Sequence, residues 1–83
     1  MHITIKYFAS IRESMGTASE AVTTHATTLA ALRDELVARG GPAAEVLSRE
    51  RPVRVALNQT MAEESAALVE GAEVAFFPPV TGG

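Results

Sequence analysis

The sequence predicts an α+β domain in which a mixed sheet packs against one main helix. Several short segments alternate apolar and polar residues, as strands do, whereas one longer segment repeats its apolar residues at helical spacing. The chain has 83 residues, 47% of them apolar, which is enough for one small core and too apolar for a disordered chain. Strands gathered around a single helix belong to the α+β class.

The first two strands are expected at residues 2–8 and 19–24. In the first, one face carries three apolar residues that we expect to be buried, Ile3, Ile5 and Tyr7. Phe8 lies on the opposite face. Residues 11–16 break the alternation, and Gly16-Thr17 supplies a turn into the second segment, which is rich in β-branched residues. The two strands are expected to form a hairpin.

The main helix is expected over residues 29–39, with Thr27 or Thr28 as its N-cap. Its apolar stripe is made of Leu29, Leu32 and Leu36. Three charged residues are expected to face water, Arg33, Asp34 and Glu35. Gly40-Gly41-Pro42 ends the helix, because glycine accepts the left-handed cap and proline cannot continue the hydrogen-bond ladder.

The second half of the chain supplies the remaining strands. Residues 43–49 are expected to form a helical turn, and residues 52–57 alternate as a strand. Asn58-Gln59 turns the chain into a short strand at 60–62, and a turn at 70–72 leads into a final strand at 73–77. In a chain of this length, the resulting order of elements favours the β-grasp, or ubiquitin-like, roll.

The last six residues are expected to form a narrow, extended tail. We therefore divide the chain into a β-grasp domain, residues 1–77, and a flexible diglycine tail, residues 78–83. Pro78 and Pro79 favour an extended backbone, which lowers the entropy lost when the tail is inserted into a partner. Gly82 and Gly83 have no Cβ and can thread a narrow channel. Such a tail reaches on the order of 20 Å and suits delivery of the Gly83 carboxylate into another protein's active site.

Strand alternation also predicts an exposed apolar patch beside this tail. If Val74 and Phe76 face the helix, Phe77 points away from it, as Phe8 does. Together with Met61, these two aromatic residues would make a patch suited to a protein partner. The alternative for the three residues is ordinary packing within the sheet.

The side chains themselves predict neither an active site nor a metal site. The chain has no Cys, and His2 and His25 lack any ligand spacing. Glu63 and Glu64 are interpreted as solvated carboxylates, and no serine has the surroundings of a nucleophile. The net charge of −3, without a Lys/Arg cluster, argues against nucleic acid or a membrane surface as partner. Because the start of the chain does not resemble a signal peptide, we expect a cytoplasmic protein.

Three segments resemble the small, sulfur-carrying subunit of molybdopterin synthase, a family similar to ubiquitin in fold. The most specific is the closing segment at residues 71–83, GAEVAFFPPVTGG. Supporting resemblance comes from residues 57–61, LNQTM, and from residues 7–13, YFASIRE. Together with the matching length, these segments spread the resemblance over essentially the whole chain.

The resemblance implies a non-catalytic, sulfur-donating subunit that binds no cofactor itself. An ATP-dependent adenylating enzyme would activate Gly83, and a sulfur donor would convert the adenylate to a thiocarboxylate. The tail would then enter the large subunit of molybdopterin synthase and pass its sulfur to cyclic pyranopterin monophosphate. The family forms a heterotetramer of two small and two large subunits.

The resemblance also implies roles for particular residues. The docking face for the large subunit would be made of Phe8, Met61 and Phe77, with Met61 standing where leucine is more usual. The tail residues that would enter the partner are Pro78, Pro79, Val80, Thr81, Gly82 and Gly83. Arg12 occupies a position that implies contact with the activating enzyme.

Other functions remain open at this point. The same carrier chemistry serves thiamin thiazole synthesis, tRNA thiolation and cysteine synthesis. A protein modifier would instead join its diglycine to lysines. A plain interaction domain would be indifferent to truncation of the tail.

Overall fold

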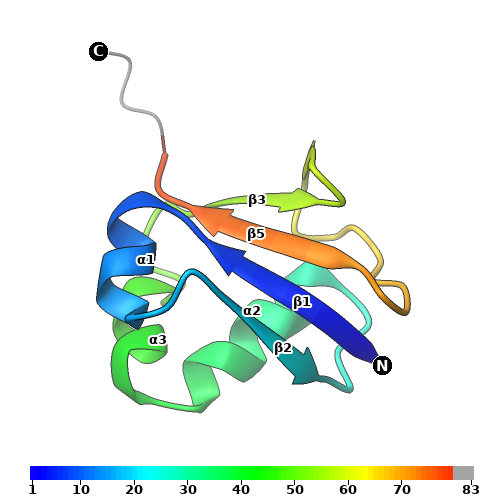
Figure 1. The fold of residues 1–83 in the computed structure, drawn as a ribbon, viewed down its shortest axis with the longest axis horizontal. Helices are drawn as coiled ribbons and strands as arrows, with labels where there is room; N and C mark the ends of the chain where they lie inside the picture. The colour runs from blue at the N-terminus through cyan, green and yellow to red at the C-terminus, as the bar shows by residue number, and fades with distance from the viewer. Residues whose placement is uncertain (80–83) are drawn as a thin grey trace.

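A five-stranded mixed sheet carries three helices on one of its faces (Figure 1). The computed structural model describes residues 1–79. In chain order, the elements are β1 (His2–Tyr7), α1 (Ala9–Met15), β2 (Ser19–Thr23), α2 (Leu29–Ala38), α3 (Gly41–Val46), β3 (Arg54–Leu57), β4 (Thr60–Ala62) and β5 (Glu73–Phe77). The predicted α+β class is confirmed.

The sheet has the strand order β2-β1-β5-β3-β4. The central strands β1 and β5 run parallel, and every other neighbouring pair is antiparallel. The first and last strands of the chain therefore lie side by side in the middle of the sheet. This arrangement places the start of the tail, at the end of β5, next to the start of α1 (Figure 1).

The core lies between the sheet and the helices, on the faces that strand and helix spacing predicted. The expected residues of β1 are all buried, namely Ile3, Ile5 and Tyr7. So are the leucine stripe of α2 and the inward residues of β5, Val74 and Phe76. Thr28 is the N-cap of α2, and its hydroxyl accepts a hydrogen bond of 3.1 Å from the amide of Ala31.

Helix α1 was not predicted, because residues 11–16 were interpreted only as a break after the first strand. The helix has seven residues, only Ile11 of them is buried, and no side chain caps its start. Such a short segment shows too little periodicity to be recognised. The strands β1 and β2 pair antiparallel as expected, but α1 joins them in place of a tight turn.

Helix α3 begins and ends earlier than the helical turn predicted at residues 43–49. Gly40 has a φ of 78° and separates α2 from α3, so the predicted end of the main helix is confirmed. Pro42 lies in the first turn of α3, where its missing N–H costs nothing. The same glycine and proline therefore end one helix and begin the next.

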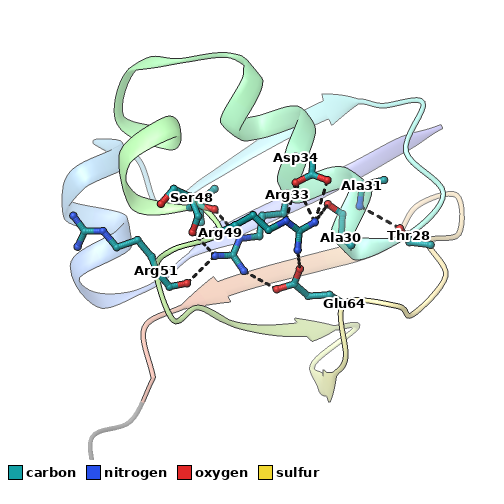
Figure 2. A network of polar contacts seen from close by, with 10 residues as sticks. Thr28, Ala30, Ala31, Arg33, Asp34, Ser48, Arg49, Arg51 and Glu64 are labelled. Carbon is teal, nitrogen blue, oxygen red and sulfur yellow. Dashed lines mark hydrogen bonds and ion pairs between the residues drawn. The ribbon is translucent and has the colours of Figure 1, made fainter.

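The prediction that Arg33 faces water is wrong. Arg33 is only 4% exposed, and its guanidinium lies among main-chain carbonyls and one carboxylate (Figure 2). It donates hydrogen bonds to the carbonyls of Leu47, Ser48 and Arg51, and pairs with Glu64 at 2.6 Å. Because each nitrogen has a partner, burial of this charge is tolerated. Arg33 thereby fixes the segment between α3 and β3.

Helices long and apolar enough to cross a membrane do not occur within residues 1–79.

Candidate functional site

The candidate site lies where β5 ends and the predicted tail begins. Pro78 and Pro79 are half-buried there and line a groove of about 300 Å³ together with residues of α1 and of the segment before β3. Val80, Thr81, Gly82 and Gly83 lie outside the described residues. The domain boundary at residue 77 and the roles given to the tail therefore stay predictions.

Phe8 and Phe77 form a pair directly beside this point. The parallel register aligns Tyr7 with Phe76, so the next residue of each strand lies on the outer side of the sheet. The two rings are 6.2 Å apart between centroids and meet edge to face at 84°. This geometry is favourable for aromatic pairs. Phe8 remains 45% exposed, which agrees with the orientation expected from strand alternation.

Met61 lies on the same outer face but not against the aromatic pair. It stands opposite Ala56 across the β3–β4 pair, and Ala56 stands opposite Ala75 across the β3–β5 pair. Both alanines are buried at 7% exposure, whereas Met61 is 49% exposed. We call the surface made of Phe8, Phe77, Ala75, Ala56 and Met61 the docking face. By strand register, the two alanines lie between Met61 and the aromatic pair.

Strand alternation predicts the two ends of the docking face, whereas its middle residues, Ala56 and Ala75, were not predicted. Ala56 and Ala75 occupy the outward positions of their strands, on the same side of the sheet as Phe77. The signal was present, because both follow the same alternation that placed Phe77 outward.

Arg12 lies on α1 one helical turn after Phe8, and its backbone amide donates a 3.3 Å hydrogen bond to the Phe8 carbonyl. Its side chain is exposed and has no ion pair within the described part of the chain. A role in contacting an activating enzyme stays a prediction.

The titratable groups with shifted pKa values serve the fold. The Arg39 guanidinium hydrogen-bonds to Glu20 and lowers the pKa of that carboxyl group. Burial raises the pKa of the Tyr7 phenol, which donates a 2.7 Å hydrogen bond to the same carboxylate. These groups connect β1, β2 and α2 rather than lining the docking face.

Residues 1–79 contain no cluster of His, Cys, Asp or Glu side chains that could hold a metal ion. The reactive group expected from the sequence belongs to the tail.

Comparison with protein families and known proteins agrees with this arrangement. The family model described as "ThiS family" matches residues 5–83. The molybdopterin synthase sulfur carrier subunit of Escherichia coli strain K12 is 40% identical over 81 residues, which cover 98% of this chain and 99% of that protein.

Two solved structures have the same fold. The crystal structure of SAMP1, small archaeal modifier protein 1, from Haloferax volcanii superposes with a TM-score of 0.78 at 30% identity, covering 100% of each chain. The complex of subunits 1 and 2 of the molybdopterin-converting factor from Helicobacter pylori 26695 contains a chain with a TM-score of 0.71 at 24% identity, again covering 100% of each chain. At that identity, the second likeness shows the fold alone.

Proposed function

The chain belongs to the ThiS family, and from this premise we propose that it is the sulfur carrier subunit of molybdopterin synthase. The observation that carries the proposal is the position of the docking face at the exit of the tail. A partner that covers Phe8 and Phe77 lies directly beside Pro78, so it is placed to receive whatever the following residues carry.

The reactive group in this proposal is the carboxylate of Gly83. A free carboxylate is a poor acyl donor, because its leaving group would be oxide. Attack of the carboxylate on the α-phosphorus of ATP, with release of pyrophosphate, gives an acyl adenylate whose leaving group is AMP. A sulfur donor then replaces AMP and leaves a C-terminal thiocarboxylate. Transfer of this sulfur to cyclic pyranopterin monophosphate, with water supplying oxygen, restores the carboxylate.

The partners follow from the same proposal. The large subunit of molybdopterin synthase binds the docking face and receives the tail, in a heterotetramer of two small and two large subunits. The ATP-dependent adenylating enzyme contacts Arg12 at the neighbouring helix. Pro78 and Pro79 hold the departing chain extended, which keeps the reactive group aligned in the partner's site. The carrier works in the cytoplasm.

Deletion of Gly83 tests this proposal. We expect loss of molybdenum cofactor synthesis in a strain that depends on the variant, because the reactive carboxylate then belongs to Gly82 and falls short of the partner's site. The thermal midpoint should be unchanged, since the buried residues that the structure describes, from Ile3 to Phe76, are all retained. Addition of one glycine after Gly83 is the matched control for position and should also abolish synthesis. Undiminished synthesis by the deletion variant would contradict the proposal.

A second candidate is a protein modifier, because the chain is also similar to a small archaeal modifier protein. This function predicts Gly-Gly remnants on target lysines, detectable by mass spectrometry of digested cell protein. Carriers for thiamin, tRNA thiolation or cysteine synthesis are separated by rescue of strains that lack one pathway each.

A further inference from the structure

Three of the seven Lys and Arg residues lack an ion pair within residues 1–79. The other four are paired: Lys6 with Glu73, Arg33 with Glu64, Arg39 with Glu20, and Arg49 with both Asp34 and Glu64. The three without a carboxylate are Arg12, Arg51 and Arg54. Because the other four cations are each paired with a carboxylate, the position of the three unpaired arginines indicates where a partner could supply one.

All three lie around the exit of the tail. Arg12 follows Phe8 by one helical turn, and Arg51 lines the groove beside Pro78 and Pro79. The Arg51 side chain points away from the network that Arg33 makes with the Arg51 carbonyl (Figure 2). Of the three arginines, Arg54 lies nearest to the docking face, because it stands directly opposite Phe77 in the β3–β5 ladder.

Arg54 belongs to the docking face by strand geometry. Residues opposite each other in an antiparallel pair project from the same side of the sheet, so Arg54 shares the side of Phe77. It lies two residues before Ala56 and lines, together with Met61, a groove of about 460 Å³ at the β3–β4 edge. Any protein that covers both Phe77 and Met61 must therefore also cover Arg54.

Covering an arginine without pairing it is strongly unfavourable, because the charge loses its hydration and gains nothing in return. Residues 1–79 offer Arg54 no nearby carboxylate with which to pair. Glu63 and Glu64 line the same groove, but neither lies within 4.0 Å of the Arg54 guanidinium. Glu64 is already bound to Arg33 and Arg49. The partner must supply the acceptor, and a carboxylate matches the planar guanidinium fork with two parallel hydrogen bonds.

We infer that Arg54 is a specificity-determining residue that pairs with a carboxylate of the protein covering the docking face. The inference rests on the proposed function, in which that protein is the large subunit of molybdopterin synthase. The large subunit then presents an apolar surface to Phe8, Phe77 and Met61 with an acidic residue beside the place where Phe77 binds. Apolar contact supplies affinity, and the ion pair selects this carrier over chains that lack a cation at the same place.

The inference is tested by measuring the dissociation constant of the purified large subunit from the same organism for Arg54 variants, by titration calorimetry at low and high salt. Arg54→Glu should weaken binding by roughly 10-fold or more at low salt. Arg54→Gln should weaken it less, because the partner's carboxylate then loses its pair but meets no like charge. Arg54→Lys should recover part of the loss. The differences should shrink at high salt.

A matched control carries the same change in net charge at the opposite end of the molecule. Thr23→Glu combined with Val69→Glu adds two negative charges at exposed positions near the N-terminus, as Arg54→Glu changes +1 to −1. Thermal midpoints of all variants should stay close to that of the parent protein, because these side chains lie outside the core. If Arg54→Glu binds no more weakly than the control double variant, the inference is wrong.

Failure of the proposed function gives a different result. If the parent protein does not bind the large subunit at all, the partner assignment itself fails. If the parent binds and Phe77→Ala weakens binding while Arg54→Glu does not, only the role of Arg54 is overturned.

Discussion

At the scale of single residues, Arg33 shows how a buried charge can hold a segment of the main chain in place. Its Nε donates to the Leu47 carbonyl at 2.6 Å, and its Nη2 reaches the carbonyls of Ser48 and Arg51. The segment between α3 and β3 forms neither helix nor strand, although the Ser48 carbonyl also accepts a 2.9 Å hydrogen bond from the amide of Arg51. The Arg33 side chain, which belongs to α2, therefore satisfies main-chain carbonyls that a strand or helix would otherwise bond.

Replacing this side chain should destabilise the fold strongly. Arg33→Met keeps most of the volume but removes the side-chain donor from the Leu47 and Arg51 carbonyls. It also removes one of the two donors to the Ser48 carbonyl and to the Glu64 carboxylate. We expect a loss of about 3 kcal/mol in the free energy of unfolding, measured by urea titration. Arg49→Met is the control, since Arg49 binds the same Glu64 from an exposed position and should cost less. Equal losses for the two variants would contradict this role.

The burial of Arg33 was not predicted because a charged residue inside a helix usually faces water. A weaker signal did exist. Arg33 follows Leu29 by four residues and therefore lies on the flank of the leucine stripe, where a long side chain can turn inward. What the sequence does not contain is the position of the three carbonyls, because that depends on the path of the segment after α3.

At the scale of elements, the β3–β4 hairpin has an imperfect turn. Asn58 and Gln59 have φ values of 50° and 69°, and a two-residue turn of this kind needs left-handed conformations at both positions. Asn tolerates this conformation better than Gln does. Asn58 also accepts a 2.9 Å hydrogen bond from the amide of Glu73, which ties the turn to β5.

This difference predicts opposite effects for two glycine substitutions. Gln59→Gly should stabilise the protein by up to about 1 kcal/mol, because the strained backbone position is relieved. Asn58→Gly should not stabilise it, since the side-chain bond to Glu73 is lost. Thermal unfolding of both variants, followed by circular dichroism, checks the pair. Destabilisation by Gln59→Gly would show that the turn is not strained as described.

A second prediction at this scale concerns acid. Arg39 lowers the pKa of Glu20 in the folded protein, whereas in the unfolded chain the group titrates near its ordinary value of about 4.3. The stability from this pair is therefore complete above that pH and is lost as the pH falls through the lower folded value. The difference in unfolding free energy between the parent protein and Glu20→Gln should be largest near neutral pH and shrink on acidification. A gap that widens in acid would contradict this linkage.

The elements themselves were predictable where their pattern is long enough. The six residues of β1 alternate clearly, and α2 has a stripe, a cap and a glycine stop. Helix α1 has one buried residue and was not predicted, whereas α3, with six residues, was predicted only as a helical turn with shifted bounds, because such short segments show little periodicity. Both are held mainly by packing against the rest of the fold.

At the scale of the whole molecule, parallel pairing of the first and last strands explains the location of the site. It brings Phe8, at the start of α1, beside Phe77, at the end of β5, although 69 positions separate them in the sequence. Strand alternation predicted that both rings face outward. It did not predict the unpaired Arg54 opposite Phe77, because the pairing of a cation depends on which distant carboxylates the fold brings near it.

Binding through the docking face should be weakened by a charge introduced into it. Met61→Asp should weaken binding to the large subunit by roughly 10-fold or more, because the carboxylate would be desolvated in an apolar contact. Val69→Asp is a matched control, since Val69 is 54% exposed and Met61 49% exposed, but Val69 lies away from the docking face. Equal binding by both variants would exclude Met61 from the interface.

The central claim is that this chain carries sulfur on its terminal carboxylate. The most direct measurement is intact-protein mass spectrometry after incubation with ATP, the adenylating enzyme and a sulfur source. We predict a mass gain equal to one sulfur replacing one oxygen, located at Gly83 by fragmentation and absent when ATP is left out. An unchanged mass, under conditions in which the adenylating enzyme converts a known carrier, would contradict the claim.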